Sequence, residues 1–176
     1  KKIFYLAFWL LHQPFISTHA SLSVGLNLLF DNNHLGTEVG FAPNVGWQFT
    51  DDVSFNHSIV GEIGFLGMQG KDDFFKEVDA SAIPFLLNYK FQWNPNDILG
   101  LYSGVGLGFS LNKLEYTKKR REVSSKSLAW QMQFGTNVTF AESYRFNLGY
   151  RFMDTGRVSN TKGGHSIVDL GFGYQF

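Results

Sequence analysis

Cysteine is absent from the chain, so neither disulfides nor thiolate metal sites are available to it. Charged residues make up only 17% of the sequence, and 15 basic residues balance 15 acidic ones. This balance gives no electrostatic reason to expect a nucleic-acid partner. No long segment repeats its apolar residues with the period of a helix. Aromatic residues, in contrast, are abundant, since they make up 17% of the chain and include 19 Phe.

The first residues have the pattern of a secretory signal peptide. Lys1 and Lys2 form a basic start, and residues 3–11 form an apolar run. This run is too short for a helix that spans a membrane, which needs roughly 20 residues. Thr18-His19-Ala20 then offers small residues where a signal peptidase cleaves. We therefore expect residues 1–20 to be a signal peptide and residues 21–176 to form one domain.

The remaining chain alternates between apolar residues and small or polar ones. Because side chains alternate across a strand, each such segment predicts a strand with one apolar face. Eight segments follow one another, over residues 21–30, 38–49, 55–65, 83–93, 99–111, 128–140, 144–152 and 168–176. The last of them ends on Phe176, so we expect it to be the closing strand of the fold.

A soluble β-sandwich and a transmembrane β-barrel would both produce this alternation. Sandwich exteriors carry many Lys and Glu, whereas the polar parity here is mostly Gly, Asn, Gln and Ser, which suit a narrow interior. Aromatic residues also gather towards strand ends, where the aromatic girdles of an outer-membrane barrel are expected: Phe30, Trp47, Phe49, Phe91, Trp93, Trp130 and Phe140. The sequence therefore predicts an all-β protein, an eight-stranded antiparallel up-and-down transmembrane barrel.

The connections between these segments differ in length. Tight turns are expected at 50–52, 94–97 and 141–143, a modest link at 31–36, and longer loops at 67–78, 117–126 and 154–164. Short periplasmic turns and longer external loops are typical of such barrels, which would place both mature termini in the periplasm. Pro43 and Pro84 lie inside expected strands, and we expect a bulge or a local break at each.

Several of these segments resemble OmpA-like and opacity-type small outer-membrane barrels. Residues 146–156 read FNLGYRFMDTG, and the family has a similar seventh strand. The turn at 49–53, the glycine-rich stretch 104–109 and the last residues 170–176 are also similar to the family. The resemblance implies a bacterial outer-membrane location, although the peptidoglycan-binding domain of the full OmpA arrangement is not expected after Phe176.

The resemblance also implies assembly by the outer-membrane insertion machinery. That machinery would read Phe176 and the alternating residues before it, so the expected assembly signal is Leu170, Phe172, Tyr174 and Phe176. Outer-membrane lipids and lipopolysaccharide are the other expected partners, and a monomer is expected.

Charged residues on the polar parity are expected to form a salt-bridge and hydrogen-bond network inside the barrel, because buried charges are costly unless they are paired. They are Glu38, Glu62, Lys90, Arg145, Arg151 and Asp169. Such a network could be a structural plug or a gated ion path. An eight-stranded barrel is only wide enough for its own side chains, which favours the plug. For Asp169 the candidate partners are Arg145 and Arg151.

The run Lys118-Lys119-Arg120-Arg121 is the candidate site for an anionic ligand, either lipopolysaccharide phosphates or sulfated host glycans. The alternative is a solvated loop tip, and Glu115 and Glu122 flank the run.

The sequence also offers a candidate catalytic site at the outer rim. His165-Ser166 with Asp154 and Ser159 supplies the residue types of a hydrolase triad. Adjacent residues of a strand point to opposite faces, however, which argues against this hydrolase.

We therefore expect a non-enzymatic surface protein that acts in envelope integrity, adhesion or antigenic display, with host glycans or host surface proteins as candidate partners. No catalytic residue, metal site or cofactor is expected. The alternatives are a narrow ion or solute channel and, third, a lipid A-modifying hydrolase.

Overall fold

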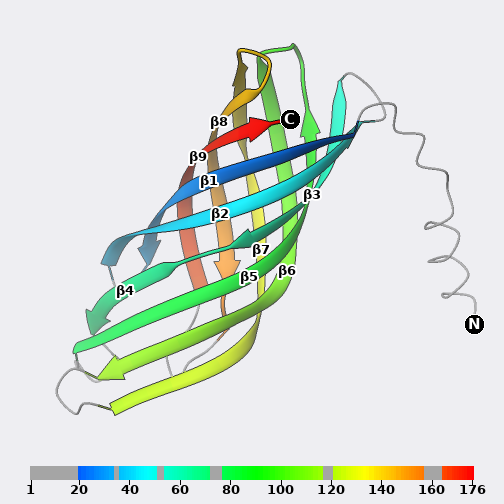
Figure 1. Ribbon diagram of the computed structural model, residues 1–176. Helices are drawn as coiled ribbons and strands as arrows, with labels where there is room; N and C mark the ends of the chain where they lie inside the picture. The colour runs from blue at the N-terminus through cyan, green and yellow to red at the C-terminus, as the bar shows by residue number, and fades with distance from the viewer. Residues whose placement is uncertain (1–19, 34–35, 51–53, 72–76, 117–120, 157–163) are drawn as a thin grey trace, which may run out of the picture.

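A computed structural model describes residues 20–33, 36–50, 54–71, 77–116, 121–156 and 164–176. Their regular structure consists of strands, and no helix among them is long and apolar enough to cross a membrane. The strands are β1 (Ala20–Asn33), β2 (Gly36–Thr50), β3 (Phe55–Ile63), β4 (Leu66–Lys71), β5 (Glu77–Trp93), β6 (Leu99–Tyr116), β7 (Arg121–Phe140), β8 (Tyr144–Asp154) and β9 (Gly164–Gln175). They form a single tilted sheet that curls round on itself (Figure 1).

The sheet closes into an antiparallel barrel. The last strand, β9, pairs with β1, from Ser23 opposite Gln175 to Asp31 opposite Ile167. β3 and β4 both pair with β5 and follow one another along it, so together they form one strand of an eight-stranded barrel. Closure satisfies the backbone hydrogen bonds within the wall, which a lipid environment requires. The predicted fold class is confirmed.

The interruption between β3 and β4 lies at Gly64, between two strands that carry prolines. The Gly64 amide donates to the Pro84 carbonyl at 2.8 Å, while the Phe65 and Phe41 backbones exchange two hydrogen bonds. In an antiparallel strand, residues two apart direct their backbone groups to the same side, so Pro43, like Phe41, faces the interrupted strand. Each proline lacks the donor that this strand would use. β2 and β5 run unbroken through their prolines, so the prediction of a bulge or break at Pro43 and at Pro84 was wrong. The interruption lies instead in the strand between them.

The two ends of the barrel differ. The turn end carries the start of β1, the turns at 94–98 and 141–143, and Phe176. The loop end carries the connections β1–β2, β4–β5, β6–β7 and β8–β9. Strands extend further towards the loop end than the sequence predicted. β1 and β2 are paired up to Asn33 and Gly36, so the predicted link at 31–36 was too long.

Outward-facing side chains are apolar along most of the wall. Leu107 and Leu128 are 65% and 72% exposed, respectively. Ring contacts between neighbouring strands support this surface, at 5.7 Å between Phe55 and Phe91 and 5.0 Å between the centroids of Phe85 and Phe109. A continuous apolar exterior of this kind is suited to lipid.

Glycines let the interior side chains and the wall approach each other. A Cβ on Gly108 would overlap the backbone carbonyl oxygen of Phe85, which side-chain rotation cannot relieve. A Cβ on Gly135 would approach the Tyr102 ring to 2.8 Å. Tyr102 and Gly135 are direct partners across β6 and β7, so the ring fills the space that the glycine leaves free.

Gly108→Ala should destabilise the barrel, by about 1–3 kcal/mol if it behaves as overpacking does in other well-packed interiors. The test is the urea midpoint of the refolded protein, followed by heat-modifiable gel mobility. Gly164→Ala is the matched control, because a Cβ there meets no atom within 4 Å. Equal midpoints for the two variants would contradict the packing argument.

Candidate functional site in the barrel lumen

The centre of the lumen is built around Arg151 on β8, whose side chain is completely excluded from solvent. Its Nη1 donates to Glu62 Oε1 at 2.7 Å, and its Nη2 donates to Asp169 Oδ2 at 2.8 Å. The carboxylates come from β3 and β9. Arg145 and Arg151 were the two predicted partners of Asp169, and Arg151 is the one that forms the ion pair.

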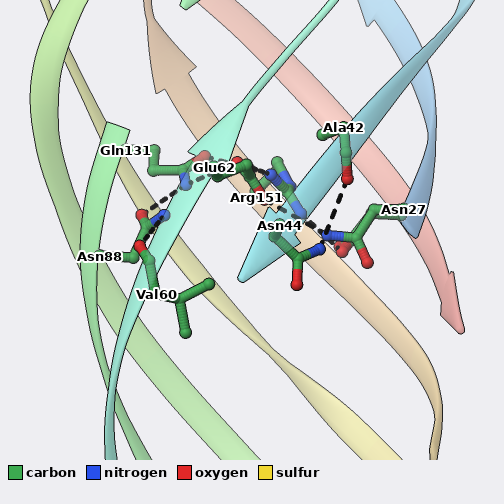
Figure 2. Close-up of polar contacts among 9 residues, drawn as sticks. Asn27, Ala42, Asn44, Val60, Glu62, Asn88, Gln131 and Arg151 are labelled. Atoms are coloured by element: carbon green, nitrogen blue, oxygen red, sulfur yellow. Dashed lines mark hydrogen bonds and ion pairs between the residues drawn. The ribbon is translucent and has the colours of Figure 1, made fainter. Parts of the chain in front are cut away.

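Amide side chains surround this ion-pair cluster. Asn27 Nδ2 donates to Glu62 Oε2 at 3.3 Å, and Gln131 Nε2 donates to Glu62 Oε1 at 3.2 Å and to Asn88 Oδ1 at 2.6 Å. Asn88 in turn donates to the Val60 carbonyl at 3.3 Å. Figure 2 shows Glu62 and Arg151 between Asn88 and Gln131 on one side and Asn27 on the other. The central network thus joins β1, β3, β5, β7, β8 and β9 across the lumen.

The remaining predicted lumen charges lie away from these ion pairs. Lys90 lies nearer the turn end, with its Nζ 5.3 Å from the centroid of the Tyr102 ring. Arg145 donates to Gln48 Oε1 at 2.9 Å. Glu38 lies towards the loop end, opposite Asp31 in the pairing of β1 and β2.

Lys90 and Arg145 line a cavity of about 80 Å³ in the turn-end half of the lumen. The other lining side chains are mainly amides and hydroxyls, among them Ser23, Asn44, Gln48, Ser58, Gln92, Asn137 and Asn147. The sequence placed both cations in the lumen but did not indicate that they share a cavity.

An apolar layer fills the lumen on the loop-end side of the central network. Its members are at most 4% exposed and come from seven of the nine strand segments: Leu29, Ala42, Leu66, Ala82, Leu86, Ala129, Met153 and Ile167. The sequence predicted a polar inward face, and this apolar layer was not expected. Its only signal was the scattered aliphatic residues on that parity.

A second polar cluster lies beyond the apolar layer. His165 Nδ1 is 2.5 Å from Asp31 Oδ2, and His165 Nε2 is 3.2 Å from Thr155 Oγ1. The Thr155 carbonyl accepts from Asn112 at 2.8 Å and from Ser127 at 2.5 Å. Sequence reasoning missed Asp31 and Thr155 as partners of His165, because Asp31 is 134 residues away in the chain.

The structure does not assemble the residues of the considered hydrolase. His165 points into the lumen and is buried, whereas Ser166 lies on the opposite face of β9. Asp154 accepts from the amide of Gly156 at 2.7 Å, and Ser159 lies outside the described residues. Among the described residues no group of three His, Asp or Glu side chains could hold a metal ion.

Of the candidate anion-binding loop, Lys118, Lys119 and Arg120 lie outside the described residues, and Arg121 begins β7. On the adjoining strands, Lys113 forms ion pairs with Glu115 and Glu122. Hydrogen bonds to Glu115 and then Glu122 raise the pKa of Lys113 above its usual range.

The candidate assembly residues Leu170, Phe172 and Tyr174 lie on the outward face of β9, and Phe176 follows that strand. Their rings contact one another and the neighbouring strand. The Tyr174 and Phe176 centroids are 4.9 Å apart, and those of Tyr144 and Phe172 are 5.9 Å apart.

A closed barrel with an apolar exterior and a packed polar lumen defines the class of transmembrane β-barrels. The chain belongs to the family of the outer membrane protein beta-barrel domain, whose family model matches residues 13–176. The predicted small outer-membrane barrel family is thereby confirmed. No curated protein sequence matches the chain significantly.

Solved structures of similar fold include several outer-membrane proteins. Neisserial surface protein A has a TM-score of 0.58 at 12% identity, covering 89% of this chain and 97% of its own. Ail of Yersinia pestis, solved with the heparin analogue sucrose octasulfate, has a TM-score of 0.58 at 15% identity and the same coverage. The outer membrane enzyme PagL has a TM-score of 0.53 at 13% identity, covering 86% of this chain and 97% of its own. At these identities the likeness shows the fold alone.

Arg151→Met should destabilise the barrel by about 3–5 kcal/mol, because it leaves the buried Glu62 and Asp169 without their cation. Urea unfolding of the refolded protein measures this loss. Combining Arg151→Met with Glu62→Gln and Asp169→Asn should restore part of the stability, since no buried charge then remains unpaired. Lys113→Met, which removes an exposed pair, is the control and should change little. An Arg151→Met protein as stable as this control would contradict the central role of the ion pairs.

Proposed function

We propose that the protein is a non-enzymatic outer-membrane surface protein that acts through its loop end, in envelope integrity, adhesion or antigenic display. In this proposal the barrel is an anchor, with the loops facing outside and both mature termini in the periplasm. Family membership supports the outer membrane as its location. The orientation rests on the usual arrangement of short periplasmic turns and longer external loops.

The observation that carries the proposal is the filled lumen. The central ion-pair network crosses most of the wall's strands, and the apolar layer closes the interior beyond it. Apolar constrictions exclude water, and ions do not cross them without their hydration. With its interior closed, the barrel offers partners mainly its two ends.

The loop end has the more developed surface. β5, β6 and β7 contain 17, 18 and 20 residues, whereas crossing a bilayer takes about 9–11 residues of a tilted strand. β6 and β7 remain paired as far as Tyr116 and Arg121. Leu114 packs there against Ala80 and Val123 in a small apolar cluster of its own. This extension supports the connection that contains the basic run.

In the proposal the basic run binds sulfated glycans or lipopolysaccharide phosphates, because guanidinium groups match sulfate and phosphate geometry. The ion pairs of Lys113 with Glu115 and Glu122 support this assignment. Both flanking carboxylates are engaged by Lys113, which reduces their attraction for the basic run. The complex of the similarly folded Ail with sucrose octasulfate guides the choice of heparin as the probe.

Replacing Lys118, Lys119, Arg120 and Arg121 together with Ala should lower heparin affinity by about tenfold or more, because several charge-assisted contacts are lost. Binding of the refolded protein to immobilised heparin at fixed ionic strength measures the effect. The control replaces Lys126, an exposed lysine of the loop-end half outside the run, with Ala. Unchanged binding by the quadruple variant, or an equal loss in the control, would refute the loop assignment.

A channel is the second candidate, and the closed lumen argues against it. We expect the purified wild-type barrel to show no steady conductance in planar bilayers, because the apolar layer interrupts any aqueous path. Replacing Leu29 and Ile167 with Ser makes that layer polar. The conductance of this variant shows what leakage through a damaged lumen looks like and is compared with that of the wild type. Steady conductance in the wild type would overturn the anchor proposal in favour of a channel.

A further inference from the structure

We propose that the cavity between Lys90 and Arg145 is a binding site for a small inorganic oxyanion of the phosphate or sulfate type. Two cationic side chains line the cavity, and none of its lining residues is Asp or Glu. The remaining polar lining consists of amides, hydroxyls and Tyr102, all of which can donate hydrogen bonds. This composition suits an anion rather than a cation.

The charges in this half of the lumen do not cancel. Among the described inward-facing residues between the turn end and the apolar layer, Lys90, Arg145 and Arg151 are basic, and only Glu62 and Asp169 are acidic, since Asp97 and Glu142 are exposed at the turns. Arg151 engages both carboxylates directly. The excess of one positive charge therefore lies towards the cavity, where a bound anion would compensate it. Uncompensated charge in a confined site of low dielectric is costly, which makes such binding favourable.

The two cations also have unused donor capacity. Arg145 Nε is excluded from solvent and donates to no described atom, although its Nη1 donates to Gln48. Lys90 forms no ion pair or hydrogen bond with a described residue, and its Nζ lies over the face of Tyr102. The planar guanidinium could therefore present a second donor to an oxyanion while remaining anchored to Gln48.

The geometry also indicates how the anion would enter. Arg145 lines both this cavity and a larger recess at the turn end, of about 350 Å³, formed with Gln92, Asn94 and Gln175 among others. Asp97 and Glu142 also border the recess, where both are exposed. On the other side, the central network and the apolar layer close the lumen. Exchange would thus take place through the turn end alone.

The size of the cavity limits the ligand. About 80 Å³ holds more than one water molecule, which suits a small inorganic oxyanion and is small for a sugar or an acyl chain. A lipid headgroup could reach the turn-end recess only from outside the barrel. We therefore assign the site to the free inorganic anion, and its discrimination from a lipid phosphate is part of the test.

The experiment is isothermal titration of the refolded full barrel with sodium phosphate in a phosphate-free detergent, against sodium chloride at equal ionic strength. Saturable binding of phosphate is expected, with sulfate as a competitor. Arg145→Gln and Lys90→Gln should each weaken it by about tenfold or more. Arg145→Lys keeps the positive charge but lacks the planar guanidinium. Its phosphate affinity should lie between those of Arg145→Gln and the wild type. Lys126→Gln, an exposed lysine outside the cavity, is the matched control and should bind as the wild type does.

Heat-modifiable gel mobility of each variant identifies any that fail to fold. If Arg145→Gln does not fold, the phosphate affinities of Arg145→Lys and Lys90→Gln test the proposal in its place. Absence of saturable phosphate binding to the wild type would overturn the proposal and indicate that the cavity holds only water. Equal binding by folded Arg145→Gln and wild type would also overturn it. Binding of a phosphoglycerol headgroup with no binding of inorganic phosphate would show a lipid site at the recess and refute the proposed cavity site.

Discussion

Arg151 is the group on which the arrangement of the lumen depends. Its guanidinium is removed from water, and a buried cation is tolerated only when carboxylates and hydrogen bonds replace its hydration. Glu62 and Asp169 supply those carboxylates from strands on two sides of Arg151. The amides of Asn27 and Gln131 then complete the coordination of Glu62. Because these partners come from distant parts of the chain, the network is complete only when the barrel has closed in the correct register.

The wall shows a complementary constraint. In a lipid environment every backbone donor and acceptor needs a partner, so prolines should be excluded from a closed barrel. Pro43 and Pro84 are tolerated because they flank the same interrupted strand. Gly64 lies between them and still donates to the Pro84 carbonyl. Concentrating two missing donors at one place leaves the pairing of β1 with β2 and of β5 with β6 continuous.

The sequence predicted the wall well, because the period of two is a local property. It predicted the eight strands, their outward faces and the tight turns at 94–97 and 141–143, while the turn predicted at 50–52 lies outside the described residues. It also gave Arg151 and Asp169 as inward-facing charges, although not which cation Asp169 would meet. Contacts across the lumen depend on strand tilt and register, which alternation does not encode. The pair of Asp31 and His165 and the apolar layer that contains Leu29 and Ile167 were missed for that reason.

The layers of the lumen make its two ends chemically different. At the loop end, His165 and Asp31 pair with each other above an apolar layer, and the extended strands β6 and β7 continue beyond them. At the turn end, Lys90 and Arg145 face a cavity that no carboxylate lines, and the nearby carboxylates Glu62 and Asp169 are paired with Arg151. The same ion pairs that stabilise the barrel therefore create the positive excess on one side of it. Because the lumen is closed between them, the positive excess at the turn end is separated from the polar cluster at the loop end, and the two ends present different chemistry.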